Sequence, residues 1–359
     1  MNKKIIFTTG GTGGHILPAF NLMKHFFDKG YQVLLVTDFR GKKFLESYPE
    51  LDFRVIKTGT PTSKNIFKKF SSLFLILYAM IISINILKKE KPNLIFGFGG
   101  YVSFPICFVA KLFNLPTVLY ENNVVLGRAN KYLLPFAKKI LVAKKIIKNF
   151  PKKYLNKFCQ VGSILNKNIT NYTLKKENSG KKNFSILVLG GSQGAEIFGK
   201  VIPEVIKMIK EQGHEIEINQ QCIEQQKNHL FNFYKKHNIK NNIFIFKEDI
   251  INLISNTNLA ITRCGASTTA ELSHTQTPFI AVPLPNSIDN HQFLNAKYYE
   301  EKGYCWILEQ NNFTSENLFN LVIKIIKNRK KLEDVRENMR KDYSKNTYSN
   351  IENEIKGFI

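Results

Sequence analysis

The sequence is short of the residues that mark several common classes of protein. Its five cysteines are scattered without a Cys-x-x-Cys pair, which argues against a disulfide framework or a cysteine zinc site and fits a reducing cytoplasm. Arginine supplies only 7 of the 52 basic residues and does not alternate with aromatic residues, so we expect no nucleic-acid partner. The metal-binding Asp-x-Asp motif is missing, and we expect neither a resident metal nor another cofactor.

Positive charge, in contrast, is abundant and uneven. The formal net charge is +24. Residues 1–165 hold 23 Lys and 3 Arg against 7 acidic residues, a net charge of +19, and the rest of the chain carries +5. An anionic bilayer surface, a polyanionic substrate or a nucleic acid would explain this asymmetry. A composition rich in solvated lysines would explain it equally well.

Short apolar runs alternate with longer helical patterns, which predicts an α/β protein with parallel sheets built of βαβ units. The polar stretch 166–182 separates two similar halves. We therefore predict two doubly wound, Rossmann-like domains facing each other across a cleft, with ligands beyond the carboxyl ends of the strands. The expected strands are 4–9, 32–37, 53–57, 93–98, 116–121 and 139–143, then 184–190, 214–219, 242–246, 258–262, 278–283 and 304–308.

The segment 70–87 has no charged residue and is flanked by lysines. Its length reaches the threshold for a membrane span. A single crossing would put strands 4–9 and 93–98 on opposite sides of the membrane, although both are expected in one sheet. A buried crossover helix and a helix with one face in lipid remain, and the lysines favour a peripheral membrane patch.

The first expected strand runs into Gly10-Gly11-Thr12-Gly13-Gly14-His15. Glycines allow an anion to approach the backbone, and a helix N-terminus supplies amide donors. The loop is not a dinucleotide fingerprint, because Ile16 stands at the third glycine position, and it is not a Walker A loop. The helix dipole disfavours a charged imidazolium, so we predict that His15 is a proton acceptor rather than a capping residue.

Further loops with this character follow later strands. Glycine turns at 97–103 and 190–195 and the Asn-rich loop 121–123 suggest a phosphate-bearing ligand, although each alone fits ordinary turn chemistry. Glu271 lies where a carboxylate could accept ribose hydroxyls. As an alternative, the pattern Thr268-x-x-Glu271 is a capping box, and 289–292 could simply cap the helix that follows.

These motifs, in this order, resemble those of the MurG family. The matching stretches are GGTGGHILPA (10–19), GFGGYVSFP (97–105), ENN (121–123), GGSQGA (190–195), RCGASTTAEL (263–272) and DNHQFLNA (289–296). The resemblance implies the GT-B fold. Its first domain would be residues 1–165 with the C-terminal helix 344–359, which would bind acceptor and membrane, and its second domain would be 166–343, which would bind UDP-N-acetylglucosamine.

The resemblance also implies a reaction. An inverting, metal-independent hexosyltransferase would move N-acetylglucosamine from its UDP donor to the muramyl C4 hydroxyl of lipid I, giving lipid II in peptidoglycan synthesis. The enzyme would sit peripherally on the anionic cytoplasmic face of the inner membrane and would serve cell wall biogenesis, cell shape and cell division.

Residue roles follow from the same resemblance. His15 would be the catalytic base, and the leaving diphosphate would meet helix N-termini, loop amides and Arg263. Glu271 would bind ribose, Gln292 the sugar, and the segment around Lys247 the uracil. The other implied substrate-binding residues are Thr12, Gly13, Gly14, Asn123, Ser192, Gln193, Ala266, Ser267, Thr268, Thr269 and Ala270.

The sequence departs from the family pattern twice. Tyr120-Glu121-Asn122-Asn123 stands where the family commonly has His-Glu-Gln-Asn, with the last Asn retained. At the interdomain joint, Gly162-Ser163-Ile164-Leu165-Asn166 stands where the family has Gly-Asn-Pro-Val-Arg. The arginine contact with the donor is therefore missing, and the nearby Lys167 is a candidate replacement.

Three alternatives remain at this stage. Another GT-B enzyme, such as a diacylglycerol glycosyltransferase, would differ in its acceptor. An NAD-dependent oxidoreductase would need an acidic residue after the second strand, for which Asp38 is the candidate. A non-enzymatic polyanion-binding protein would use the basic half but would not need glycine loops in both halves.

Overall fold

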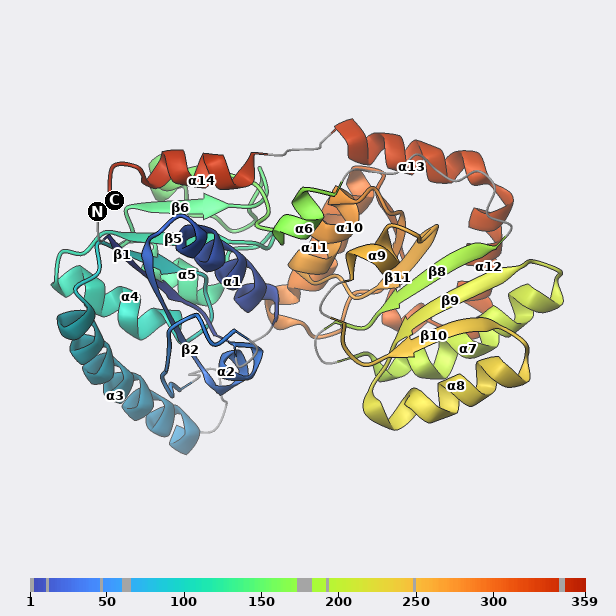
Figure 1. The fold of residues 1–359 in the computed structure, drawn as a ribbon, viewed down its shortest axis with the longest axis horizontal. Coiled ribbons are helices and arrows are strands. Elements are labelled where there is room, and N and C mark those ends of the chain that lie inside the picture. Colours follow the sequence, from blue (N-terminus) through green and yellow to red (C-terminus); the bar gives the residue numbers. More distant parts are fainter. Residues whose placement is uncertain are drawn as a thin grey trace. The chain divides into compact units, whose positions relative to one another are not determined.

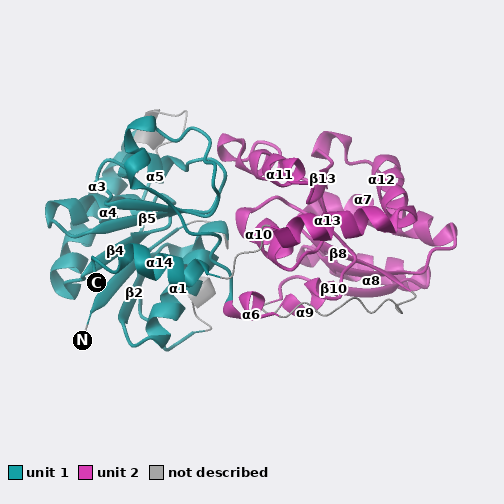
Figure 2. Cartoon of the chain, turned by 90° about the horizontal axis from the view of Figure 1, so that it is seen from above, with its two compact units in different colours: residues 1–166, 344–359 teal, residues 167–343 magenta. Residues whose placement is uncertain are grey.

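The computed structural model describes residues 3–10, 13–45, 48–59, 66–172, 183–191, 194–247, 250–341 and 346–359. The chain divides into two compact units, which Figure 2 colours separately. Unit 1 comprises Met1–Asn166 with Ser344–Ile359, and unit 2 comprises Lys167–Tyr343. Each unit is a parallel sheet between two layers of helices (Figure 1).

Unit 1 contains a seven-stranded sheet with the order β3-β2-β1-β4-β5-β6-β7. The strands are β1 (Lys4–Thr8), β2 (Gln32–Thr37), β3 (Phe53–Val55), β4 (Leu94–Gly97), β5 (Thr117–Glu121), β6 (Lys139–Val142) and β7 (Phe158–Gln160). Its helices are α1 (Gly13–Asp28), α2 (Phe39–Leu45), α3 (Ile66–Glu90), α4 (Ser103–Leu112), α5 (Arg128–Leu133), η1 (Lys152–Lys157) and α14 (Thr347–Ile355).

Alternation along β1 explains both layers of unit 1. Ile5 and Phe7 pack on α1 and α14, whereas Ile6 packs on α3 and α4. A strand buried on both faces has to be apolar throughout, which is why the run is continuous in the sequence. The C-terminal helix α14 completes the first layer, where Glu352 accepts hydrogen bonds from His25 Nε2 and Lys29 Nζ, each at 2.5 Å.

Unit 2 contains a six-stranded sheet with the order β10-β9-β8-β11-β12-β13. The strands are β8 (Phe184–Leu189), β9 (Ile216–Gln221), β10 (Lys240–Phe244), β11 (Leu259–Thr262), β12 (Phe279–Ala281) and β13 (Cys305–Ile307). The helices are α6 (Lys167–Thr170), α7 (Glu196–Glu211), η2 (Glu224–Gln226), α8 (Lys227–Lys236), α9 (Ile251–Ile254), α10 (Ala266–His274), η3 (Ile288–Asn290), α11 (His291–Glu301), η4 (Gln310–Asn312), α12 (Ser315–Lys327) and α13 (Arg329–Lys341).

All twelve strands expected from the sequence are confirmed as strands, and all pair in parallel. Only β7 was not predicted. It is an edge strand of three residues that pairs with β6, and none of its residues is fully buried. Such a short, half-exposed strand leaves little apolar pattern in a sequence.

Strand order reverses beside β1 in unit 1 and beside β8 in unit 2. The first connection after each of these strands turns to one side of the sheet, whereas β4 and β11 lie on the other side. Loops that follow the paired strands at such a switch point diverge and leave room for a ligand. The fold therefore places the glycine loops of both units at the positions where a doubly wound sheet binds ligands.

Candidate functional site

The switch point of unit 1 lies between the loops after β1 and β4. These loops approach so closely that side chains would not fit: a Cβ on Gly100 would lie 2.8 Å from the Gly10 carbonyl oxygen, and Gly100 has a φ of +75°. Ser103 Oγ lies 2.9 Å from the carbonyl oxygen of Thr8 and 2.6 Å from that of Gly99, which ties the start of α4 to both loops. The two glycine turns are thus one structural element.

His15 lies in the first turn of α1 and is partly buried. Its ring rests on Gly99, where an added Cβ would lie 3.4 Å from His15 Cε1 and 3.5 Å from Nδ1. Gly13, the first residue of α1, and Gly14 precede it. The imidazole is therefore held at the switch point by the second glycine turn.

The next strand, β5, ends in a carboxylate that is 1% exposed. Glu121 Oε1 accepts hydrogen bonds from the backbone N–H and the Nδ2 of Asn123, both at 3.1 Å. Oε2 accepts from the backbone N–H of Gly127 at 2.9 Å and from Asn130 Nδ2 at 3.0 Å. Four donors offset the cost of burying this group, and the carboxylate fixes the loop that carries Asn123.

The departure at Tyr120 has a structural role. Its hydroxyl lies 3.1 Å from the Gly162 carbonyl oxygen and 3.3 Å from Asn122 Oδ1, and it accepts a hydrogen bond from the backbone N–H of Ile164 at 3.0 Å. The phenol therefore binds the end of β5 to the joint segment that precedes α6. Asn166, at the end of this segment, is exposed, and Lys167 begins α6.

The switch point of unit 2 lies between β8 and β11. Gly191, after β8, has a φ of +81°, and α10 begins at Ala266 directly after the loop that follows β11. The N-cap of α10 is Gly265, without a side-chain hydrogen bond, so the capping-box interpretation of Thr268 and Glu271 is wrong. Both residues lie inside the helix because it starts earlier than that pattern requires.

Arg263 is 8% exposed and joins three strand ends. It donates from Nη1 to the carbonyl oxygens of Val282 at 3.2 Å and Pro283 at 3.3 Å, and from Nη2 to Gln310 Oε1 at 2.5 Å. The guanidinium also lies 5.0 Å from the ring centroid of Phe198. Desolvation by burial lowers the pKa of Arg263. These contacts make it a brace for the loops after β11, β12 and β13.

Gln292 lies in the first turn of α11, and its amide orientation is fixed. Its Oε1 accepts hydrogen bonds from the backbone N–H groups of Cys264 at 3.2 Å and Leu284 at 3.0 Å. The Nε2 group is consequently the end available to a ligand, as a donor. Asp289 and Asn290, with φ values of 53° and 54°, form a left-handed turn before α11. No side-chain hydrogen bond caps this helix at Asn290, so the capping interpretation of 289–292 is also wrong.

Glu271 extends from the second turn of α10 and is partly exposed. Desolvation raises the pKa of Glu271 to about 7. A carboxylate kept close to neutral by its surroundings is a group that gains from a hydroxyl donor, and perturbed groups of this kind gather at functional sites.

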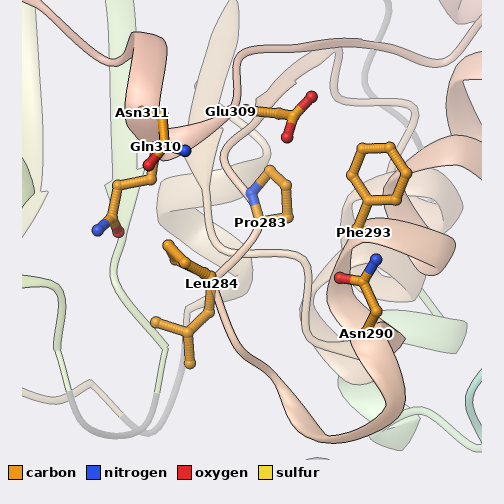
Figure 3. A pocket seen from close by; sticks show the side chains of 8 residues that line it. Pro283, Leu284, Asn290, Phe293, Glu309, Gln310 and Asn311 are labelled. Carbon is orange, nitrogen blue, oxygen red and sulfur yellow. The ribbon is translucent and has the colours of Figure 1, made fainter.

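A small pocket of about 130 Å³ opens beside this rim. As Figure 3 shows, it is walled by residues that follow β12, by the start of α11 and by residues that follow β13, among them Pro283, Asn290 and Gln310. Pro283 and Gln310 also receive the Arg263 hydrogen bonds. The brace therefore shapes one wall of the pocket.

Comparison with known proteins decides the family. The model of the glycosyltransferase family 28 N-terminal domain matches residues 5–142, and that of the C-terminal domain matches residues 185–354. The UDP-N-acetylglucosamine--N-acetylmuramyl-(pentapeptide) pyrophosphoryl-undecaprenol N-acetylglucosamine transferase of Pelagibacter ubique is 37% identical over 352 residues, covering 98% of this chain and 97% of that protein. The chain belongs to the MurG family.

Other members agree. The Rickettsia canadensis transferase of the same name is 36% identical over 341 residues, covering 94% of this chain and 95% of that protein. The crystal structure of Acinetobacter baumannii MurG is similar over 99% of both chains, with a TM-score of 0.79 and 26% identity. The fold is therefore GT-B, with two doubly wound domains, as the sequence predicted.

The MurG-type motifs are distributed over the two rims as the resemblance implied, with some gaps. His15, Gly13, Gly14 and Asn123 lie around the switch point of unit 1. The α10 residues Ala266, Ser267, Thr268, Thr269, Ala270 and Glu271 lie with Arg263 and Gln292 on the rim of unit 2. Lys247 follows β10 and is exposed. Thr12, Ser192 and Gln193 lie outside the described residues.

Sequence reasoning missed three contributors to these rims: Glu121 as a carboxylate receiving four donors, Asn130 beneath it, and Gln310 opposite Arg263. A buried acid at a strand end was the available signal for Glu121. Asp38, the acidic residue of the oxidoreductase alternative, instead accepts hydrogen bonds from the backbone N–H groups of Arg40 at 3.0 Å and Gly41 at 3.1 Å at the start of α2.

Proposed function

We propose that this protein transfers N-acetylglucosamine from UDP-N-acetylglucosamine to the muramyl C4 hydroxyl of lipid I, with inversion, to give lipid II. The observation that carries the proposal is the match to transferases named for this reaction, which extends over both units. The geometry of both rims supports it and gives each predicted residue a chemical role.

In unit 2 the donor would lie against the start of α10. Backbone N–H groups at this helix start suit the diphosphate, and the ionised Glu271 would accept hydrogen bonds from the ribose hydroxyls. Gln292 presents Nε2, because its oxygen is held by Cys264 and Leu284, and would donate to a sugar oxygen. Arg263 supports this rim through Val282, Pro283 and Gln310 rather than by direct contact with the leaving group. Ser192, Gln193 and Lys247 would complete the donor contacts.

In unit 1 His15 would take the proton of the acceptor hydroxyl as that oxygen attacks the anomeric carbon. The C–O bond to the diphosphate breaks on the opposite face, so a single displacement inverts the anomeric centre. Asn123, with its side chain held by Glu121, would position the acceptor, together with Thr12, Gly13 and Gly14. General bases of this kind commonly contribute about 10²- to 10⁴-fold to the rate.

The membrane attachment would use α3. By length and composition this helix could cross a membrane, but Ala79, Ser83 and Leu87 are buried against the rest of unit 1. The helix connects β3 and β4, which belong to one sheet, and this connection argues against a span. The other side of α3 exposes a row of large apolar side chains, here called the α3 apolar face: Phe67, Phe70, Leu73, Phe74, Leu77, Tyr78 and Ile81.

Exposed apolar rows of this size mark interaction surfaces rather than free surface. The +19 charge of residues 1–165 and the exposed Lys88 and Lys89 at the end of α3 favour an anionic bilayer as the partner. We therefore propose that the protein attaches peripherally to the cytoplasmic face of the inner membrane, where a lipid-linked acceptor is presented, and that it binds no nucleic acid.

The test is transfer of labelled N-acetylglucosamine to a soluble lipid I analogue, with wild type compared with His15→Ala. We expect kcat to fall by about 10²- to 10⁴-fold while UDP-N-acetylglucosamine still binds. No transfer by the wild type, or transfer to diacylglycerol instead, would refute the assigned acceptor. Full activity of His15→Ala would remove His15 as the base and leave the reaction intact.

A further inference from the structure

A buried amide oxygen stands out beside the switch point of unit 1. Asn130, in α5, is 1% exposed. Its Nδ2 donates to the carbonyl oxygen of Tyr120 and to Oε2 of Glu121, both at 3.0 Å. These two contacts use both amide hydrogens. Oδ1 points away from them, is shielded from solvent, and receives no hydrogen bond from any residue that the structure describes.

The orientation of this amide is not arbitrary. If its oxygen and nitrogen were exchanged, the oxygen would face the Tyr120 carbonyl and the Glu121 carboxylate, which are both acceptors. The hydrogen bonds therefore fix Oδ1 as an acceptor turned away from β5. Buried acceptors without a donor are few in native proteins, and one at a functional rim requires an explanation.

His15 is the donor within reach of this position. A Cβ built on Gly99 would lie 3.5 Å from His15 Nδ1 and 3.6 Å from Asn130 Nδ2, so the imidazole and the amide border the same α-carbon. Gly99 has no side chain to separate them. The edge of the ring that faces this point carries Nδ1, which leaves Nε2 on a different side of the ring.

We propose that Asn130 is a positioning residue whose Oδ1 accepts a hydrogen bond from Nδ1–H of His15 during the reaction. The structure does not show this hydrogen bond itself, and catalytic hydrogen bonds commonly tighten only when substrate binds. The contact would fix the tautomer that carries its lone pair on Nε2. This inference rests on the proposed function, in which His15 removes the acceptor proton.

The chemistry of an amide suits this task. A neutral imidazole bears one N–H, and an acceptor at Nδ1 selects the tautomer with the proton there. An amide oxygen orients the ring without placing a negative charge beside it. Glu121 holds the amide from behind, and Gly127 N–H holds Glu121, so the orientation of His15 would depend on a chain of buried hydrogen bonds.

The decisive experiment measures the tautomer of His15 directly. The full-length protein, labelled with ¹⁵N-histidine, would be studied by long-range ¹H–¹⁵N correlation at pH 8 with UDP-N-acetylglucosamine and no acceptor. His15→Gln would assign the signal. We expect the Nδ1–H tautomer in wild type and a shift toward Nε2–H in Asn130→Ala. An Nε2–H tautomer in wild type, or no change in the variant, would overturn the proposal.

Kinetics on the soluble acceptor provide the second measurement. We expect Asn130→Ala to lower kcat by about 10- to 100-fold and to leave KM for UDP-N-acetylglucosamine unchanged. The matched control is Asn241→Ala in β10. Asn241 Nδ2 also donates to a backbone carbonyl, that of Ile239 at 3.0 Å, and its Oδ1 likewise receives no hydrogen bond from a described residue.

The outcomes separate the inference from the function on which it rests. The wild-type tautomer is measured without turnover, so it decides the question even if Asn130→Ala does not fold. If His15→Gln is inactive but His15 carries its proton on Nε2, the base stands and Asn130 does not position it. Full activity of His15→Gln would remove the base and this inference together. An equal loss of kcat in Asn241→Ala would mean that the effect is not specific to His15.

Discussion

The two rims of this protein are organised around buried charges of opposite sign. In unit 1 the Glu121 carboxylate receives hydrogen bonds from three residues. In unit 2 the Arg263 guanidinium donates to three residues. In each case the charge is satisfied by the protein, and uncharged amides held nearby, Asn123 and Gln292, are left for ligands. A charged residue in a glycine-rich rim is therefore not necessarily a ligand contact.

The units also differ on their surfaces. Residues 1–165 carry a net charge of +19, and unit 1 bears the α3 apolar face. Unit 2 contains the carboxylate whose pKa is raised to about 7. The difference fits a division in which one unit meets a membrane-borne anion and the other meets a soluble nucleotide. Variants that affect one unit alone can test whether this division holds.

The largest effect is expected from removing the unit 2 brace. Arg263→Met leaves the carbonyl oxygens of Val282 and Pro283 and the Gln310 amide without their buried donor, a loss of about 3 kcal/mol. If the donor loops shift by that free energy, kcat/KM for UDP-N-acetylglucosamine falls by about 150-fold. Steady-state kinetics and thermal stabilisation by the donor measure it. Arg340→Met is the control, since Arg340 donates to Gln276 within the same unit. Normal donor affinity in Arg263→Met would show that Arg263 is not a brace.

A smaller effect, in the other unit, is expected from Glu121→Gln. The new amide turns an N–H toward groups that are themselves donors, at a cost of about 2 kcal/mol. We expect kcat on the soluble acceptor to fall by about 30-fold and the Kd for UDP-N-acetylglucosamine, measured calorimetrically, to stay unchanged. Glu217→Gln, at an exposed ion pair with Lys240, is the control. Weakened donor binding in Glu121→Gln would contradict the separation of the two rims.

The strands and glycine loops could be predicted because they depend on local pattern. Buried parallel strands such as β1 require continuous apolar runs, and the turns at Gly10 and Gly100 require glycine. The hydrogen-bond chains could not be predicted. Asn130 meets Glu121 across 9 residues, but Gln310 meets Arg263 across 47, and no periodicity relates such partners.

The capping-box interpretation of Thr268 and Glu271 shows a different limit. The residue pattern was present, yet α10 begins after Gly265, so the two residues lie in the interior of the helix. A capping pattern identifies a helix start only where the backbone ends at the same residue, and that boundary depends on how β11 enters its sheet.

The division between units also predicts a membrane effect confined to unit 1. Replacing Phe74 and Leu77 with Ser removes two exposed apolar side chains, 73% and 51% accessible, from the α3 apolar face. We expect binding to anionic vesicles to fall by at least about tenfold, while activity on a soluble acceptor stays unchanged. Vesicle sedimentation measures the first quantity. Phe231→Ser, on α8 of unit 2, should change neither. Equal losses of vesicle binding and soluble activity would show that this face belongs to the core.

The smallest effect is a pH dependence that belongs to unit 2 alone. Burial raises the pKa of Glu271 to about 7, so the carboxyl is mostly protonated at pH 6 and mostly ionised at pH 8. Ribose hydroxyls bind the ionised form better, so the donor should bind about tenfold more tightly at pH 8 than at pH 6. Calorimetry with UDP-N-acetylglucosamine avoids interference from the ligand, whose diphosphate diester does not titrate in this range. Glu271→Gln should bind more weakly at pH 8 and show no such slope. A slope that persists in Glu271→Gln would assign the titration to another group and would leave the raised pKa without a role in binding.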